Sequence, residues 1–295
     1  MLSKFRGAVT LALVAVNTLV HTTALLAVAL FKLLLPFARA RRVLSRVLTL
    51  IAERWIGVNS AMIDRFTKTR ISVHGGDGLR YTGWYLVISN HQSWVDIVVL
   101  QKVFNRRIPF LKFFLKRELI WVPLLGLAWW ALDFPFMKRY TPEQVKRRPE
   151  LRGADIRETR QACARFRHIP VSVMNFVEGT RFTAGKHVRH AAAYQNLLRP
   201  KAGGVAFVMN AMGEVLQSLI DVSIVYPAGP PTLFDLLAGR VPEIRIRIHE
   251  RPIPHDLLCG DYENDAEFRA RFQVWINDLW AQKDAEIAAM LRRCK

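Results

Sequence analysis

A scarcity of cysteines and of acidic side chains sets the first limits on this sequence. Cys163, Cys259 and Cys294 lie far apart and form no C-x-x-C pair. This pattern excludes a zinc knuckle or a disulfide framework and fits a reducing compartment. We interpret Cys163 as an inert thiol rather than a catalytic one. Asp and Glu together number 24 against 43 Lys and Arg, which gives a formal charge of +19.

Three common catalytic motifs are also absent. The sequence has no G-x-S-x-G elbow, no P-loop and no G-x-G-x-x-G segment. It therefore offers no obvious serine nucleophile. A base that activates the substrate's own hydroxyl is a simpler expectation than a covalent acyl-enzyme.

Positive charge and hydrophobic residues are what the chain has in excess, and hydrophobic residues make up 51% of it. Such a chain suits a polyanionic surface, and its apolar content favours anionic lipid over nucleic acid. No charged residue lies between Gly7 and Phe31, and at about 1.5 Å per residue a helix of that length crosses a hydrocarbon core of roughly 30 Å. A polar notch at its centre predicts a kink, or a dip into one leaflet and back. The notch comprises Asn17, His21, Thr22 and Thr23.

The residues that follow favour a membrane anchor over a cleaved signal peptide. Residues 38–40 resemble a cleavage site, but the apolar run is too long and cationic residues crowd the site. Because Lys and Arg are denser after the run than before it, we expect the rest of the chain in the cytoplasm, at a bacterial inner membrane. Arginines and apolar residues alternate over 41–66. This pattern predicts an amphipathic helix on anionic headgroups or, alternatively, a helix packed on the domain core.

We divide the chain into N-terminal membrane-anchoring helices (1–66) and a catalytic domain (67–295). Short apolar runs alternate with helical patterns in the second part, which is typical of an α/β domain with a mostly parallel central sheet flanked by helices. The expected strands are 70–74, 84–89, 108–114, 171–176, 219–226 and 244–249. The expected helices are 93–104, 142–150, 155–167, 189–196, 203–213 and 263–292.

A polar segment, SNHQSWVDI at 89–97, follows the second expected strand. Ligands of open α/β sheets sit beyond the carboxyl ends of the strands, where this segment lies. Ser93 and Asp96 match an S-x-x-D helix start, so in the simplest interpretation Asp96 only caps a helix and His91 is a turn residue. In the alternative, Asp96 bonds one imidazole nitrogen and His91 acts as general base through the other. Backbone N–H groups near the helix start are then expected oxyanion donors.

Two further charged turns follow apolar runs. NFVEGTRF at 175–182 places Glu178 and Arg181 at the same sheet edge, where the guanidinium fork suits phosphate. FPFMKR ends in Lys138 and Arg139, which suit the same phosphate. An ordinary surface ion pair and a solvated basic pair are the respective alternatives.

Two weaker signals complete the pattern. VYP at 225–227 ends a strand in proline and by itself says little. Lys201 with Gly203 and Gly204 is a further anion contact of low specificity.

The segments NHQSWVD, FPFMKR, FVEGTR and VYP resemble, in order and spacing, the four blocks of the glycerolipid acyltransferase family, over roughly residues 84–227. The chain looks like the 1-acylglycerol-3-phosphate acyltransferases of phospholipid synthesis. The resemblance implies transfer of a fatty acyl group from acyl-CoA or acyl-carrier protein to a lysophospholipid hydroxyl, giving phosphatidate. Lys138 stands where many members have Asp, which leaves lysophosphatidate, lysocardiolipin and lysophosphatidylglycerol open as acceptors.

The resemblance also implies residue roles. His91 is the base and Asp96 orients it, while Pro227 belongs to the fourth block, near the acyl-donor site. Because a thioester is already activated, we expect no metal and no cofactor beyond the acyl donor. The implied glycerol-phosphate binders are Arg139, Glu178, Gly179, Thr180 and Arg181.

The apolar run 119–137 is a candidate for a second membrane span. A single crossing here would put His91 and Arg181 on opposite sides of the bilayer, and the prolines at 123 and 135 suit a spanning helix poorly. We expect instead a hydrophobic surface or groove that abuts the membrane and helps admit acyl chains. A non-catalytic lipid-binding protein stays open as a rival function. Nucleic-acid binding has only the charge in its favour, and no motif.

Overall fold

A six-stranded sheet with the order β1-β8-β7-β2-β6-β3 forms the centre of the computed structural model. All its neighbours are parallel except β7 and β8, so the expected mostly parallel sheet is confirmed. The strands are β1 (Arg70–His74), β2 (Tyr85–Ser89), β3 (Leu111–Phe113), β6 (Ser172–Phe176), β7 (Ser218–Val225) and β8 (Glu243–Arg251). The short strands β4 (Leu115–Lys116) and β5 (Phe136–Met137) pair separately. The structure describes residues 1–137, 147–148, 166, 169–189, 193–213, 215–258 and 260–292.

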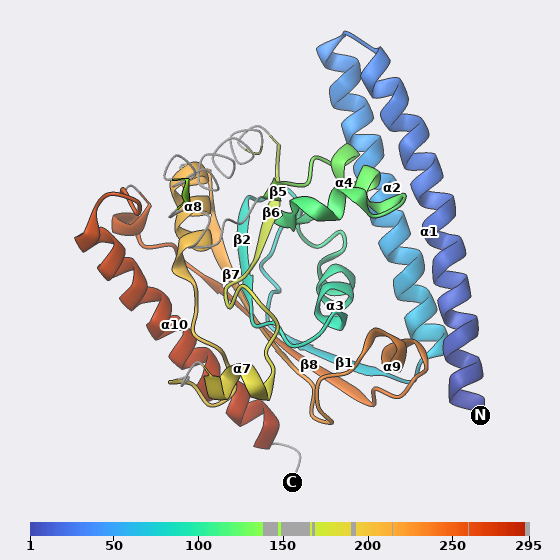
Figure 1. The fold of residues 1–295 in the computed structure, drawn as a ribbon. Coiled ribbons are helices and arrows are strands. Elements are labelled where there is room, and N and C mark those ends of the chain that lie inside the picture. The colour runs from blue at the N-terminus through green and yellow to red at the C-terminus, as the bar shows by residue number, and fades with distance from the viewer. Residues whose placement is uncertain are drawn as a thin grey trace.

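Helices cover both faces of this sheet (Figure 1). The hairpin of α1 (Leu2–Leu34) and α2 (Ala38–Phe66) lies with α3 (Val95–Phe104) on one face. The other face is covered by α8 (Ala202–Met212) and α10 (Ala266–Arg292). Every residue of β2 is buried because successive side chains enter opposite cores. The smaller helical elements are η1 (Arg117–Trp121), α4 (Leu125–Ala131), α7 (Ala184–Arg189), α9 (Leu233–Leu237) and η3 (His255–Leu257).

One expected helix, 189–196, is wrong. Helix α7 ends at Arg189, and residues 193–196 are not helical. The physical reason is Asp284 of α10, whose carboxylate accepts the backbone N–H groups of Gln195 and Asn196 at 2.7 Å each. The expected helices 142–150 and 155–167 fall largely outside the described residues, as do Cys163, Cys259 and Cys294.

The polar notch of the N-terminal run faces α2. The Asn17 amide donates to the backbone oxygen of Trp55 at 3.2 Å and to Asn59 Oδ1 at 2.8 Å. Asn17 is thereby satisfied by the partner helix, while His21 and Thr23 bond backbone oxygens of α1 itself, and α1 runs as one helix through the notch. The helix expected over 41–66 is present as part of α2. At the far end of the hairpin large apolar side chains are exposed, namely Leu30, Phe31, Leu33, Leu34 and Phe37.

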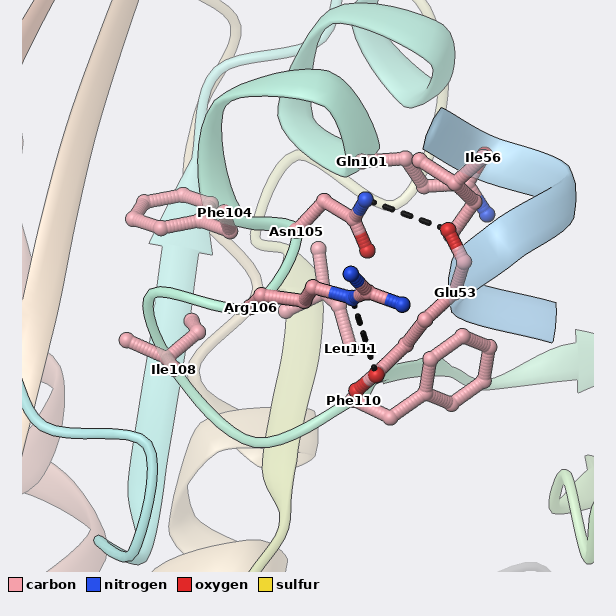
Figure 2. Close-up of a pocket in the computed structure, with 9 residues that line it drawn as sticks. All are labelled: Glu53, Ile56, Gln101, Phe104, Asn105, Arg106, Ile108, Phe110 and Leu111. Atoms are coloured by element: carbon pink, nitrogen blue, oxygen red, sulfur yellow. Dashed lines mark hydrogen bonds and ion pairs between the residues drawn. The ribbon is translucent and has the colours of Figure 1, made fainter. Parts of the chain in front are cut away.

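Glu53 fixes α2 to the domain (Figure 2). Its carboxylate is buried and accepts from the Tyr81 hydroxyl at 2.6 Å, with Arg106 Nε at 3.6 Å. Its backbone oxygen accepts from the Asn105 amide at 3.2 Å, just beyond the end of α3. Burial, with Glu53 beside it, raises the pKa of Tyr81 to about 12, so this hydroxyl stays a donor. The hairpin is therefore held in a fixed position on the domain.

The start of α1 also rests on the domain, beside α9 (Figure 1). A Cβ atom at Gly7 would lie 2.8 Å from Phe234 Cζ, so a side chain there would displace the Phe234 ring. Both ends of the hairpin thus lie against the domain, and the turn between α1 and α2 projects away from it.

The run 119–137 folds into η1, α4 and β5. Within the described part of the chain, α1 is the one helix long and apolar enough to cross a membrane. The run therefore does not form a second span, as expected. It exposes Trp121, Leu124, Leu127 and Trp130. A small hollow, open to solvent, lies between α4 and the hairpin, and among its lining residues are Leu25, Trp55, Phe110, Leu125 and Trp129.

Candidate active site

The site begins at Asn90, where β2 ends. Its buried amide accepts from Ile224 N–H and donates to Ile224 C=O, both at 2.9 Å. These two bonds continue the pairing of β2 with β7 for one more residue through a side chain. The next residue, His91, is thereby positioned at the carboxyl edge of two central strands.

His91 and Asp96 are in direct contact. His91 Nδ1 lies 2.8 Å from Asp96 Oδ2, and the same oxygen accepts the backbone N–H groups of Gln92 at 2.7 Å and Ser93 at 2.9 Å. Because an ionised carboxylate only accepts, we assign the proton to Nδ1, which leaves the lone pair of Nε2 available. Asp96 therefore satisfies the turn and orients the ring at once, so the two interpretations of its sequence position are not exclusive.

The start of α3 differs in detail from the expected capping box. The helix begins at Val95, and the Ser93 hydroxyl accepts Val95 N–H at 3.0 Å. The N–H groups of Gln92 and Ser93 point to Asp96. These three N–H groups are occupied and do not serve as the expected oxyanion donors.

Tyr226 adds a fourth donor to the same carboxylate. Its hydroxyl donates to Asp96 Oδ1 at 2.5 Å, and both groups are buried. Burial, with the Asp96 carboxylate beside it, raises the pKa of Tyr226 well above its usual range, so the hydroxyl keeps its proton. The sequence analysis took this residue only as part of VYP, because a tyrosine at a strand end carries no specific signal. Pro227 follows in a turn and is partly exposed.

The turn after β6 holds the backbone of His91 from two sides. Glu178 Oε1 accepts His91 N–H at 3.1 Å and Oε2 accepts Leu198 N–H at 3.2 Å. His91 C=O accepts Phe182 N–H at 2.7 Å. Burial raises the pKa of Glu178 to about 8 against the lowering effect of these two N–H groups. Glu178 therefore organises the backbone, and its carboxyl does not face outward as one half of a surface ion pair.

An aromatic ring limits the motion of His91. Phe176, the last residue of β6, stacks on the imidazole with ring centroids 3.9 Å apart and planes 13° apart. The His91 side chain keeps 13% of its surface exposed. The ring is thus enclosed on one face and still accessible.

Arg181 and Lys186 place two cations beside this turn. The Arg181 guanidinium lies 4.9 Å from the centroid of the exposed Trp94 ring. Lys186 Nζ donates to Thr180 Oγ1 at 2.7 Å and to Arg181 C=O at 3.1 Å. The sequence analysis did not single out Lys186, since one lysine in a basic chain carries no signal of its own.

Gly179 makes the turn possible. It has φ +66°, and a Cβ atom there would lie 3.1 Å from Lys201 Cδ. Lys201 therefore passes over the turn, while Gly204 packs on Asn175 of β6. The structure thus brings His91, Asp96, Glu178, Gly179, Thr180 and Arg181 to one edge of the sheet. Lys138 and Arg139 lie outside the described residues.

Comparison with known proteins adds three findings. The family model described as "Acyltransferase" matches residues 70–227. The chain is similar to 1-acyl-sn-glycerol-3-phosphate acyltransferase delta of Rattus norvegicus, with 23% identity over 84% of this chain and 62% of the relative. It is also similar to the gamma form of Mus musculus, with 24% identity over 81% of this chain and 59% of the relative. The chain thus spans about three fifths of the length of these curated relatives.

A solved structure shares the fold. The crystal structure of the 1-acyl-sn-glycerophosphate acyltransferase PlsC from Thermotoga maritima superposes with a TM-score of 0.53 and 16% identity. The match covers 95% of this chain and 97% of that chain.

Proposed function

The chain belongs to the acyltransferase family, and from this premise we propose that it transfers a fatty acyl group to the free hydroxyl of 1-acylglycerol-3-phosphate. The donor is acyl-CoA or acyl-carrier protein, and the product is phosphatidate. The observation that carries the proposal is the imidazole of His91, which is bonded to Asp96 through Nδ1 and, within the described residues, has no partner at Nε2, on the same sheet edge as Arg181.

In the proposed reaction His91 is the general base. Nε2 removes the proton of the acceptor hydroxyl as its oxygen attacks the thioester carbonyl carbon. The tetrahedral intermediate collapses, the C–S bond breaks, and the thiolate takes the proton back from the imidazolium. The Asp96 carboxylate stabilises the imidazolium and holds the ring in the productive tautomer, and such catalysis contributes roughly 10²–10⁴-fold. No metal or cofactor takes part in this scheme.

The acceptor phosphate belongs near Arg181 in this proposal. Thr180 and Gly179 shape the turn that presents the guanidinium, and Glu178 links that turn to His91. The resemblance adds Arg139 as a phosphate ligand and Pro227 near the acyl donor.

The test compares two histidines that both pair with a carboxylate. We expect His91→Ala to abolish formation of phosphatidate from lysophosphatidate and acyl-CoA, while sedimentation with anionic vesicles persists. His249→Ala is the matched control, since His249 lies on β8 outside the site and its Nε2 is 2.6 Å from Glu286 Oε1 of α10. Unchanged transfer by His91→Ala would refute the proposed base. If the wild type prefers lysophosphatidylglycerol or lysocardiolipin, the acceptor assignment is wrong.

We further propose that the hairpin enters one leaflet of a bacterial inner membrane and returns, with the domain on the cytoplasmic side. Both hairpin ends lie against the domain, and the projecting turn is rich in exposed apolar residues. Epitope tags at the two ends of the chain test this topology by protease access. A re-entrant hairpin leaves both tags on one side of the membrane, whereas a crossing helix separates them.

A further inference from the structure

Lys186 occupies an unusual place for a lysine on a short helix. Instead of extending into solvent, its half-buried side chain folds back to the preceding turn, where Nζ bonds Thr180 Oγ1 at 2.7 Å and Arg181 C=O at 3.1 Å. An ammonium group has three donors, so the third is available to a ligand. The amine is therefore fixed beside the backbone from which the Arg181 side chain departs.

Arg181 is held from the other side. Its guanidinium lies over Trp94, and within the described residues it has no ion-pair partner. Trp94 is the residue just before α3, three positions after His91. Stacking on an aromatic face leaves the edge of a guanidinium, with its N–H groups, free for an oxyanion. The Lys186 amine thus lies at the backbone of Arg181, and the N–H of the next residue, Phe182, ties this backbone to His91.

The only carboxyl group of this turn does not neutralise the two cations. Glu178 points its oxygens to the backbone N–H groups of His91 and Leu198. Burial raises its pKa to about 8, so it is mostly uncharged at neutral pH. Lys201, whose Nζ would lie 3.5 Å from a Cβ at Gly179, adds positive charge on the other side of the turn.

We propose that Lys186, together with Arg181, selects acceptors whose headgroup is a phosphomonoester over those whose headgroup is a phosphodiester. A phosphomonoester carries a charge of about −1.5 to −2 at pH 7, whereas a phosphodiester carries one negative charge. The second cation therefore favours the headgroup with the additional charge. The inference rests on the proposed function, because it assigns the phosphate to this turn.

The experiment compares lysophosphatidate with lysophosphatidylglycerol of the same acyl chain, using the full chain and vesicles that contain each acceptor. The variant Lys186→Met keeps most of the side-chain length and removes the charge. Arg189→Met is the matched control, because Arg189 lies on the same helix and, among the residues that the structure describes, its side chain bonds Gly185 C=O of that helix. Transfer gives kcat and KM, and equilibrium binding of each acceptor without an acyl donor gives a second readout.

We expect Lys186→Met to reduce the preference for lysophosphatidate about fivefold, as the loss of one partly exposed charge pair predicts. The change should be in KM and in binding, with kcat for both acceptors nearly unchanged. Arg189→Met should keep the preference. An equal loss for both acceptors would overturn the proposal and show that Lys186 only stabilises the turn, and an unchanged preference would overturn it as well.

The binding readout separates this inference from the proposed function. If the wild type binds lysophosphatidate preferentially and Lys186→Met loses that preference, the inference stands even if no acyl transfer is detected. If transfer is detected but binding shows no dependence on Lys186, the function stands and the inference is wrong.

Discussion

Replacing Asp96 with asparagine tests whether the carboxylate charge drives the proposed reaction. Asp96 accepts from four donors, three on Oδ2 and the Tyr226 hydroxyl on Oδ1. An asparagine amide must place its oxygen where the three donors converge, because an NH₂ group there would face three N–H groups. Its NH₂ group then faces Tyr226, whose hydroxyl can rotate and accept. Asp96→Asn therefore keeps the geometry and removes the charge.

The expected cost in stability is moderate. Three bonds at the former Oδ2 position change from charge-assisted to neutral, at about 1 kcal/mol each. Relief from burying a charge offsets part of this loss. Domains are stable by about 5–15 kcal/mol, so the variant should fold. Asp96→Ala is a poorer test, because it leaves the donors of His91, Gln92, Ser93 and Tyr226 without any acceptor.

Activity should fall much further than stability. Without the carboxylate, the imidazolium formed on proton uptake loses its counter-charge, and we expect kcat to drop roughly 10²–10⁴-fold. The assay measures phosphatidate formed from lysophosphatidate and acyl-CoA in vesicles, with a thermal unfolding curve of the same preparation. Combining His91→Ala with Asp96→Asn should cost no more than His91→Ala alone. A folded Asp96→Asn variant that retains activity within threefold of the wild type would refute the proposed role.

Three other changes probe the surroundings of the site. Tyr226→Phe should lower the unfolding free energy by about 2 kcal/mol and kcat about tenfold, measured by denaturant titration and acyl transfer; a destabilised variant with normal kcat would limit Tyr226 to the fold. Burial raises the pKa of Glu178 to about 8 from the ordinary 4.5. Between these two pH values the carboxyl group keeps its proton in the folded state, while the unfolded chain loses it. Stability should therefore fall as pH rises from 4.5 to about 8, and Glu178→Gln should flatten this slope relative to the wild type in unfolding at a series of pH values. Gly179→Ala should cost about 1–2 kcal/mol from its left-handed backbone, with a higher KM for the acceptor, and an unchanged melting curve would show that the turn tolerates a side chain.

Periodicity and strand composition were sufficient to predict most of the sheet. The run at 84–89 matches β2 within a residue, because its side chains face two cores and must be apolar throughout. The run at 70–74 matches β1, an edge strand whose central residues are only partly buried. The helix expected at 189–196 was wrong because Asp284, almost ninety residues away, takes the N–H groups of residues 195 and 196. Local helix propensity gives no information about a hydrogen-bond acceptor so distant in the sequence.

The site was predictable where charged residues lie close together in sequence. His91 and Asp96 are five residues apart, and their contact follows from a strand end and a helix start. The Tyr226 contact spans 130 residues and depends on the pairing of β2 with β7. The inward direction of the Glu178 carboxyl group depends likewise on tertiary packing. From the sequence alone, a turn that contains Glu and Arg suggests an ion pair on the surface. The division into an anchor and a domain at residue 66 stays a prediction.

The backbone of His91 has both its hydrogen-bonding groups committed to residues about ninety positions later, N–H to Glu178 and C=O to Phe182. The segments around 91 and 180 consequently move as one body. Any displacement that an arriving headgroup imposes on the cationic turn is passed to the imidazole through these two links. A change that shifts the backbone of this turn would therefore displace the base and lower turnover, whereas the loss of one side-chain charge that leaves the backbone in place would change affinity alone.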